Sequence, residues 1–592
     1  MNESFLKQFQ QFWLDYMFLI GSGKSRLLLV LLLSFVMSLL EVIGVGMVGG
    51  YIALIAGVGY ASEWIEKWSF GLLSTVSNRE SIVILGALLV FIFLFKAAAT
   101  LMTNYLIYRI TNLFMLDLRL RTMRHYQIQP YMSHISRSAP EYIRTITGYV
   151  KQFIGALNAA IIFVNEAIIA IAIVIFLVVQ SALSTSLLII GFSGLSIFYY
   201  SVFRKKIKKN AVEANAAQKD LIASVTEGFL GFKEVRIFGA ESFFLSIVAR
   251  ATKVEIKTGI FLALVRQVPR LFLQVGIVLA IVLFVYHSEF EDGNRAEIYP
   301  LLAMFGFGAL RLMPSISQML AAIVQIKNNS PARKELVSDL GKPTVSINLS
   351  ESLNDRWKFL ELDLIGVSLS YPNSTTSVLE DVSFRVESEE IIGIVGASGS
   401  GKTTLIDLML GLLEPTLGQV VVNSRPLRDI LNEWRNQIAY IPQDVLLIDD
   451  TIKANVGFGI QEKEIDEVRV RSVLDKVKLG EFVEGRPHGI HTRVGEMGIG
   501  LSGGQKQRIV LARALYRNRK VLILDEATSA LDYDTEREIL EELNQLKGSV
   551  TIVVITHRRS ILAYCDRVYE VANKTVKEIG NYKDIAKSSD QS

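Results

Sequence analysis

The pattern of hydrophobic and polar positions changes near residue 328. Before it, six long apolar runs alternate with polar segments, and each run is long enough to cross a bilayer as a helix of about 20 residues. After it, charged residues are frequent, and short apolar strands alternate with helical patterns. This pattern predicts an all-α six-helix transmembrane domain followed by an α/β nucleotide-binding domain on a largely parallel sheet. The expected spans are 27–58, 82–110, 147–180, 185–203, 263–287 and 298–326.

Two further segments complete the predicted organisation. Aromatic and apolar residues recur every three or four positions near the start, which predicts an N-terminal helix in the membrane interface. Its apolar face comprises Phe5, Phe9, Phe12, Trp13, Tyr16 and Met17. The stretch 328–355 has low hydropathy and contains Pro331, Gly341 and Pro343, so we interpret it as a linker. The predicted domains are therefore a transmembrane domain over 1–327, a linker over 328–355 and a nucleotide-binding domain over 356–592.

Charged residues beside the spans indicate the orientation. Three arginines follow the second span and five basic residues follow the fourth, whereas the connection at 181–184 carries no charge. By the positive-inside bias, both termini and the nucleotide-binding domain face the cytoplasm of a plasma (inner) membrane. The polar segments 111–146 and 204–262 then extend the membrane helices into the cytosol, with short crosswise helices expected near 131–138 and 228–239. For the outer loop 59–81, a helix on the leaflet and a plain loop both remain open.

Composition narrows the class of partner. The net charge is only +4, and the basic residues cluster near membrane ends, so we expect no nucleic-acid partner. The single cysteine, Cys565, excludes an intrachain disulfide and is interpreted as a small buried side chain. The first 20 residues lack a basic n-region and a small-residue cleavage site, so no removable signal peptide is expected.

A glycine-rich stretch after the apolar run 391–395 predicts a phosphate-binding loop. Glycines allow backbone N–H groups to turn towards an anion, the following helix directs its positive end there, and Lys402 adds a formal charge. Thr403 is placed to ligate Mg²⁺. The ATP-binding residues of this loop are Gly396, Ser398, Gly399, Ser400, Gly401, Lys402, Thr403 and Thr404.

A second apolar run, 521–524, is followed by Asp525 and Glu526. In an α/β sheet, ligands bind at the carboxyl ends of the strands, where these two carboxylates would lie. Asp525 is then a candidate Mg²⁺ ligand through water, and Glu526 a candidate base for the attacking water. The pairing with an upstream phosphate loop favours catalysis over a structural role.

Other motifs resemble those of ATP-binding cassette proteins over about 357–585. Leu501 begins a stretch similar to the family's signature, Ile441 and Pro442 precede a residue similar to its Q-loop glutamine, and Ser529 begins a stretch similar to its D-loop. The resemblance implies that Tyr371 stacks on adenine, that Gln443 is catalytic and contacts Mg²⁺, and that His557 is the switch histidine. It also adds Ser502, Gly503, Gly504, Gln505 and Asp532 to the ATP site.

In that family, the signature closes on the γ-phosphate held by a partner domain. This chain has one such domain, so the resemblance implies a homodimer with two shared ATP sites, and six spans with one cassette resemble an exporter half-transporter. The implied activity is ATP hydrolysis coupled to transmembrane transport, with ATP and Mg²⁺ as cofactors.

Ionisable residues within the spans are candidates for contacting the transported molecule. Burying a charge at the bilayer centre costs roughly 2.5–3.5 kcal/mol on insertion scales, so such residues are functional candidates by default. They are Glu41, Lys96, Glu166, Arg270 and Arg311. Structural roles remain open for each of them, such as snorkelling or helix packing. Three cations per chain would become six in a dimer cavity, which favours an anionic head group.

The membrane half also resembles the bacterial flippase of lipid-linked oligosaccharides in protein N-glycosylation, at 41–54, 268–270 and 309–315. That resemblance implies that Lys96, Arg270 and Arg311 engage a lipid pyrophosphate, although Gln318 stands where a further arginine is expected. The predicted function is ATP-driven movement of a lipid-linked oligosaccharide or related anionic glycolipid from the inner to the outer leaflet. The alternatives are an exporter of peptides or amphipathic drugs, and an ATP-gated channel or regulatory membrane receptor.

Overall fold

The computed structural model divides into two compact units along the chain. Unit 1 comprises 1–129 and 136–344, and unit 2 comprises 130–135 and 345–592. The description covers residues 14–21, 24–55, 78–180, 182–290, 295–342, 357–371, 374, 376–495, 500–526, 536–538, 541, 544–545, 547–556 and 558–580.

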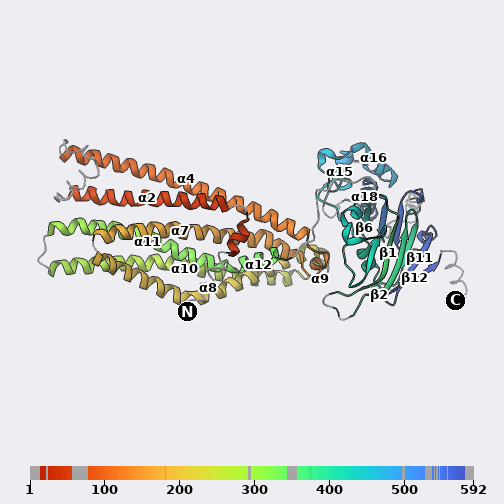
Figure 1. Ribbon diagram of the computed structural model, residues 1–592, viewed down its shortest axis with the longest axis horizontal. Coiled ribbons are helices and arrows are strands. Elements are labelled where there is room, and N and C mark those ends of the chain that lie inside the picture. Colours follow the sequence, from red (N-terminus) through yellow and green to blue (C-terminus); the bar gives the residue numbers. More distant parts are fainter. Residues whose placement is uncertain are drawn as a thin grey trace. The chain divides into compact units, whose positions relative to one another are not determined.

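Unit 1 is built from long helices that lie side by side (Figure 1). Four predicted spans fall within one helix each; 147–180 begins in the π-helical turn before α7, and 27–58 follows α2 to residue 55, where the described residues end. α4, α8 and α10 continue far beyond the apolar segment, as expected for cytosolic extensions. The six long helices are α2 (Lys24–Ile55), α4 (Asn78–Gln127), α7 (Val150–Gln180), α8 (Ala182–Leu230), α10 (Glu241–Phe290) and α11 (Arg295–Asn328).

The long helices pack in pairs, α7 with α11, α8 with α10, and α2 with α4. Their exposed surface is rich in large apolar side chains, including Phe91, Leu94 and Leu101 of α4. Such a surface is suited to lipid rather than to water. In the part of the chain that the structure describes, the helical stretches Ile82–Gln127 and Ala139–Val179 are long and apolar enough to cross a membrane.

Short helices occupy the two predicted crosswise segments. α5 (Tyr131–Ile135) lies in the first, and it is followed by α6 (Ala139–Ile143) and a π-helical turn, η2 (Arg144–Tyr149). α9 (Phe232–Phe238) lies in the second, where Gly231 precedes it and Gly239 ends it. Gly239 takes a left-handed conformation (φ +63°), which glycine adopts without a steric cost.

The described part of the N-terminal helix differs from the interfacial prediction. Residues 14–20 are helical, but Tyr16 is only 4% exposed and its ring lies 5.1 Å from that of Phe153 in α7. Leu14 and Phe18 remain exposed. The aromatic side chain of Tyr16 therefore packs on protein, where burial against α7 removes its apolar surface from water.

The predicted linker begins as a helix. α12 (Ser330–Leu340) starts with Pro331 in its first turn, where a missing N–H costs nothing, and it ends at Gly341. Ala332 and Leu336 are fully buried in unit 1. The low hydropathy of 328–355 hid this helix, because only three of its residues are buried and one of them, Asp339, is charged. The outer loop 59–77 and the remainder of the linker, 343–355, lie outside the described residues.

Unit 2 has the predicted α/β architecture. A six-stranded sheet has the order β12-β11-β3-β10-β9-β6, with β11 to β6 parallel and β12 antiparallel at the edge. Its strands are β3 (Ile391–Val395), β6 (Ile438–Ile441), β9 (Val521–Asp525), β10 (Thr551–Ile555), β11 (Arg567–Ala572) and β12 (Thr575–Gly580). A four-stranded antiparallel sheet comprises β1 (Glu361–Leu369), β2 (Leu379–Glu387), β4 (Leu417–Val422) and β5 (Arg425–Pro426).

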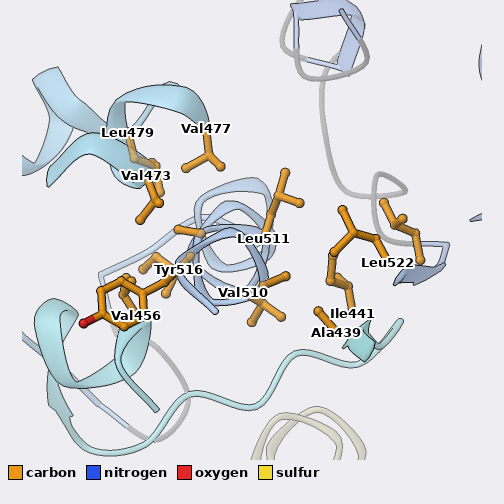
Figure 2. Close-up of a cluster of buried hydrophobic side chains, with 14 of the residues drawn as sticks. Ala439, Ile441, Val456, Val473, Val477, Leu479, Val510, Leu511, Tyr516 and Leu522 are labelled. Atoms are coloured by element: carbon orange, nitrogen blue, oxygen red, sulfur yellow. The ribbon is translucent and has the colours of Figure 1, made fainter. Parts of the chain in front are cut away.

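The remaining elements of unit 2 cover these sheets. α18 (Gly503–Tyr516) lies at the centre of a hydrophobic cluster, with Val473 and Leu479 on one side and Ile441 and Leu522 on another (Figure 2). The other helices and strands are α13 (Lys402–Met409), η3 (Leu427–Asp429), α14 (Leu431–Arg435), β7 (Asp450–Thr451), α15 (Ile452–Val456), η4 (Glu462–Glu464), α16 (Glu467–Lys476), α17 (Gly480–Glu484), η5 (Gly489–His491), β8 (Arg493–Val494) and α20 (Arg559–Leu562). α18 is therefore held rigidly from several sides.

The thiol of Cys565 should be almost inert in the folded protein. Cys565 is 7% exposed and packs against Gly393 of β3, and burial, reinforced by Asp566, raises its pKa to about 12. We expect native protein at pH 8 to react with iodoacetamide roughly a thousandfold more slowly than denatured protein, because the thiolate is the nucleophile. Mass spectrometry of the labelled peptide measures this ratio, and equal rates in the two states would contradict the buried placement.

Candidate functional site

The motif segments of unit 2 follow adjacent parallel strands. In the register of the sheet, Ile555 of β10 pairs with Ile394 of β3 and with Asp525 of β9, and Ile441 of β6 pairs with Leu524. The segments that follow these four strands therefore start at one edge of the sheet. Parallel strands place their ligands at this carboxyl edge. The phosphate loop, the 525–526 carboxylates, Gln443 and Thr556 therefore all lie at the carboxyl edge of this sheet.

The loop between β3 and α13 has the shape of an anion cradle. Gly401 precedes α13 with a φ of +106°, which a residue with a side chain adopts only with strain. At Gly396, an added Cβ would lie 2.5 Å from the carbonyl oxygen of Val571, so only glycine fits there. Ser398 and Gly399 are exposed. The backbone can therefore approach a ligand closely, next to the N-terminus of α13.

Two polar side chains of the loop fit an anionic ligand. Lys402 is 9% exposed, and its Nζ donates to the carbonyl oxygens of Gly396 (2.7 Å) and Ala397 (2.8 Å). The Ser400 hydroxyl is buried and has no hydrogen-bond partner in the described structure. A buried ammonium held only by carbonyls and an unpaired buried hydroxyl would both gain from phosphate oxygens. These residues fit a nucleotide phosphate.

Beside the loop, two buried carboxylates lie close together. Asp525 is 8% exposed and accepts a hydrogen bond from the Tyr440 hydroxyl (3.3 Å). Burial raises the pKa of Asp525 above its usual value. Burial, followed by the charge of Asp525, raises the pKa of Asp407 in α13 to about 6. A buried acid that destabilises the charge of a neighbouring acid in this way favours a bound cation.

The oxygen donors at this edge suit Mg²⁺. Thr403 offers an exposed hydroxyl, Asp525 a carboxylate and Gln443 an amide oxygen, all of them hard ligands of the kind that this ion prefers. The described residues contain no group of three His, Cys, Asp or Glu side chains that could hold a metal alone. Water and phosphate oxygens would therefore have to complete the coordination of the ion.

Glu526 is held in an unusual conformation immediately after β9. Its φ is +47°, in the left-handed region that residues other than glycine rarely adopt, and its backbone N–H donates to the Ile555 carbonyl (3.1 Å). Gln443 donates from Nε2 to Glu526 Oε2 at 2.8 Å. Strained backbone of this kind clusters at functional sites. The structure therefore brings together two of the three predicted catalytic residues.

The signature stretch forms a capped helix start. Ser502 is the N-cap of α18: its Oγ accepts from the Gln505 N–H (3.2 Å), while its own N–H donates to Gln505 Oε1 (2.9 Å). This capping box holds the turn in place. Ser502 and Gly503 are exposed, so a second helix N-terminus is available to an anion. The side-chain oxygen and the backbone N–H of Gln505 are both used in this capping box.

Comparison with known proteins decides the family. The protein-family model described as "ABC transporter" matches residues 379–529, and the model described as "ABC transporter transmembrane region" matches residues 27–288. An ATP-dependent lipid A-core flippase from Cupriavidus pinatubonensis is 30% identical over 512 residues, which cover 84% of this chain and 85% of that protein. The chain belongs to the ABC transporter family.

Two further similarities extend over nearly the whole transporter. An ATP-dependent lipid A-core flippase from Hahella chejuensis is 26% identical over 558 residues, 94% of each chain. The structure of a bacterial Atm1-family ABC exporter with ATP bound superposes with a TM-score of 0.77 at 19% identity, covering 96% of this chain and 97% of that one. The predicted fold, a helical exporter membrane domain followed by an ATP-binding domain, is confirmed, as is an ATPase coupled to transport.

The transporter's other predicted nucleotide residues divide into two groups. Tyr371 is partly buried on the core of unit 2, and its hydroxyl shares a hydrogen bond with Thr404 Oγ1 (3.2 Å), which places it beside the phosphate loop. Asp532 and His557 lie outside the described residues. The sequence prediction did not include Asp407. A charged residue between the apolar residues Ile406 and Leu408 could have indicated it. The sequence prediction also missed the role of Tyr440.

The five ionisable residues predicted within the spans lie on five different helices. Lys96 on α4 extends over the Phe93 ring (5.0 Å to the centroid) and comes close to Gly44 of α2, and Arg270 on α10 is exposed. Glu41 belongs to α2 and Arg311 to α11, and their side chains lie outside the description. Glu166 is 6% exposed and accepts from Ser315 Oγ of α11 at 2.7 Å. This hydrogen bond supports a helix-packing role for Glu166.

Proposed function

We propose that this exporter works as a homodimer that uses ATP to move a lipid-linked oligosaccharide, or a related anionic glycolipid, from the inner to the outer leaflet of the plasma (inner) membrane. The observation that carries the proposal is the presence of Lys96, Arg270 and Arg311 on membrane helices. Cations at membrane depth are costly unless they meet anions. The relatives above are named for flipping lipid A-core, also a glycolipid.

In the proposed chemistry, Glu526 orients and deprotonates the attacking water. The hydrogen bond from Gln443 keeps the Glu526 carboxylate turned towards the carboxyl edge of the sheet. Lys402 and the loop N–H groups bind the phosphates, Tyr371 stacks on adenine, and His557 is the switch residue. Thr403, Gln443 and Asp525 would hold Mg²⁺, which, when bound, neutralises charge developing on the phosphates.

Several features of the described residues support a homodimer. Each chain carries one phosphate loop and one signature turn, and both have exposed residues, which a second copy can reach. α9 and its flanks expose large apolar side chains that suit a protein contact, among them Phe229 (73% exposed), Ile237 (79%) and Phe238 (81%). In the proposed dimer, Ser502, Gly503, Gly504 and Asp532 of each copy complete the other copy's ATP site.

We also propose that both termini and unit 2 are cytoplasmic, in agreement with the basic residues that flank the predicted spans.

Neutralising the membrane cations tests the substrate. We expect Arg270→Gln or Arg311→Gln to lower glycolipid-stimulated ATP turnover and leaflet transfer in liposomes by about 10- to 100-fold, because each loses a charge-assisted hydrogen bond worth about 1.5–3 kcal/mol. Lys257→Gln on α10 is the matched control, since it removes an exposed charge from the same helix as Arg270 but outside the predicted span. It should leave transfer unchanged.

The choice of lipid separates the candidates. Vesicles carrying a polyprenyl-pyrophosphate-linked glycan and vesicles carrying lipid A-core distinguish the two glycolipids. If the arginine variants retain full activity while a peptide or neutral amphipathic drug is transported, the protein is an exporter of that class. Currents across a bilayer without ATP turnover would instead support the channel alternative.

A further inference from the structure

A buried carboxylate holds the last turn of α12. Ala332, Leu336 and Asp339 form one helical stripe, and their exposures are 0%, 0% and 1%. A stripe with this spacing normally carries apolar residues at every position. An ionised Asp at the third position is tolerated only with charged or hydrogen-bonding partners.

Three side chains supply those partners. The Tyr126 hydroxyl donates to Asp339 Oδ2 (2.5 Å), Arg137 Nη1 donates to the same oxygen (2.6 Å), and Lys342 Nζ donates to Oδ1 (3.0 Å). Burial alone would raise the pKa of Asp339, but these hydrogen bonds outweigh it and lower the pKa below its usual value. Asp339 is therefore a charged and fully engaged acceptor.

The surrounding side chains extend the cluster. The Arg137 guanidinium lies over the rings of Tyr126 (5.1 Å) and Tyr142 (5.0 Å), and it donates to Thr145 Oγ1 (3.1 Å). It also pairs with Glu141 (3.6 Å) and Glu335 (4.0 Å), and Glu141 in turn accepts from Lys219 of α8 (2.7 Å). The cluster thus links α4, α6, η2, α8 and α12, all within unit 1.

The position of the cluster along the chain is unusual. The chain passes between units 1 and 2 at three places: after residue 129, after 135 and after 344. Tyr126 precedes the first crossing by three residues, Arg137 follows the second by two, and Lys342 precedes the third by two. A single carboxylate therefore binds the chain on the unit 1 side of all three crossings.

We propose that Asp339, with Tyr126 and Arg137, is a positioning junction that makes the three chain crossings move together and so couples ATP turnover in unit 2 to the membrane helices. A short hydrogen-bonded ion pair allows little change in the distance or angle between its two groups, so movement of one chain segment moves the other. Without the ion pair, movement of the chain at one crossing would not reach the other two. The inference rests on the proposed function only for the choice of transported lipid.

Asp339→Asn tests the junction, since it keeps the shape of the side chain but removes the charge that Arg137 and Lys342 share. We expect ATP turnover without lipid to stay within about twofold of wild type, while lipid transported per ATP falls about tenfold, which corresponds to roughly 1.4 kcal/mol of coupling. Tyr126→Phe, which keeps both ion pairs, should act in the same direction by about threefold if Asp339→Asn folds poorly.

Arg333→Gln is the matched control. Arg333 lies on the same helix and pairs with Asp15 at 2.5 Å, with side chains 13% and 9% exposed, similar to the 12% and 2% of Arg137 and Asp339. Arg333 precedes the third crossing by 11 residues and Asp15 precedes the first by 114, so this pair lies farther along the chain from the crossings than the Asp339 cluster does. We expect Arg333→Gln to lower thermal stability without changing the lipid transported per ATP. The same uncoupling in Arg333→Gln would overturn a specific role for Asp339.

Hydrogen–deuterium exchange of the full-length transporter, with and without ATP and vanadate, gives a readout that needs no lipid. In wild type, nucleotide should change the rate of amide exchange in both units. In Asp339→Asn, nucleotide should still change the exchange rate in unit 2 but no longer in α7 and α11. A nucleotide response that persists in unit 1, or parallel loss of turnover and transport, would mean a merely structural cluster. If no lipid stimulates wild type but this exchange pattern holds, only the proposed substrate fails.

Discussion

Glu526→Gln is expected to slow ATP turnover by about 10²- to 10⁴-fold, the range that a positioned general base contributes, while ATP binding is retained. The substitution keeps the size of the side chain and can still accept the hydrogen bond from Gln443, which is 2.8 Å long in the wild-type structure. It removes only the ability to take a proton from water. Phosphate release under saturating ATP measures the first effect, and equilibrium binding of a fluorescent nucleotide measures the second.

Two variants control for indirect effects of Glu526→Gln. Glu484→Gln removes an exposed carboxylate from α17 of the same unit and should leave turnover unchanged. Gln443→Ala removes the hydrogen bond but keeps the carboxylate, so we expect a smaller loss, about tenfold. Wild-type turnover in Glu526→Gln would refute the assignment of this residue as the base.

Lys402→Met is expected to weaken ATP binding by about 100-fold or more. The Lys402 ammonium is nearly buried in the loop, and each charge-assisted hydrogen bond that it transfers to phosphate oxygens is worth about 1.5–3 kcal/mol, so losing two of them changes the dissociation constant by at least two powers of ten. Isothermal titration with ATP in the presence of EDTA measures this affinity without turnover.

The control for Lys402→Met is Lys520→Met, which removes an exposed lysine from the same unit and should leave ATP affinity unchanged. Thermal unfolding separates binding from stability, because Lys402 also donates to two carbonyls of its own loop. We expect a shift of only a few degrees in the absence of nucleotide. Unchanged ATP affinity in Lys402→Met would argue against phosphate binding at this loop.

Most of the fold and of the nucleotide site was predicted from patterns over short stretches of sequence. The phosphate loop, the strand before Asp525 and the spans of unit 1 were evident in the sequence, because glycine spacing, strand length and hydropathy act over short stretches. The helix Ser330–Leu340 within the predicted linker was not foreseen, because a narrow buried stripe in a polar segment has no strong local signal. Tyr16 was assigned to lipid because the sequence shows an aromatic face but not its partner.

The sequence by itself determined most of the elements that form, that one half of the chain is apolar and the other binds nucleotide, and which side chains are chemically suited to hydrolysis. The tertiary structure decided which distant residues meet. Tyr126 and Asp339 are 213 positions apart, and Gln443 and Glu526 are 83 positions apart. Such contacts depend on strand order and helix packing, because a side chain's hydrogen-bond partner is selected by distance in space and leaves no periodic trace along the chain.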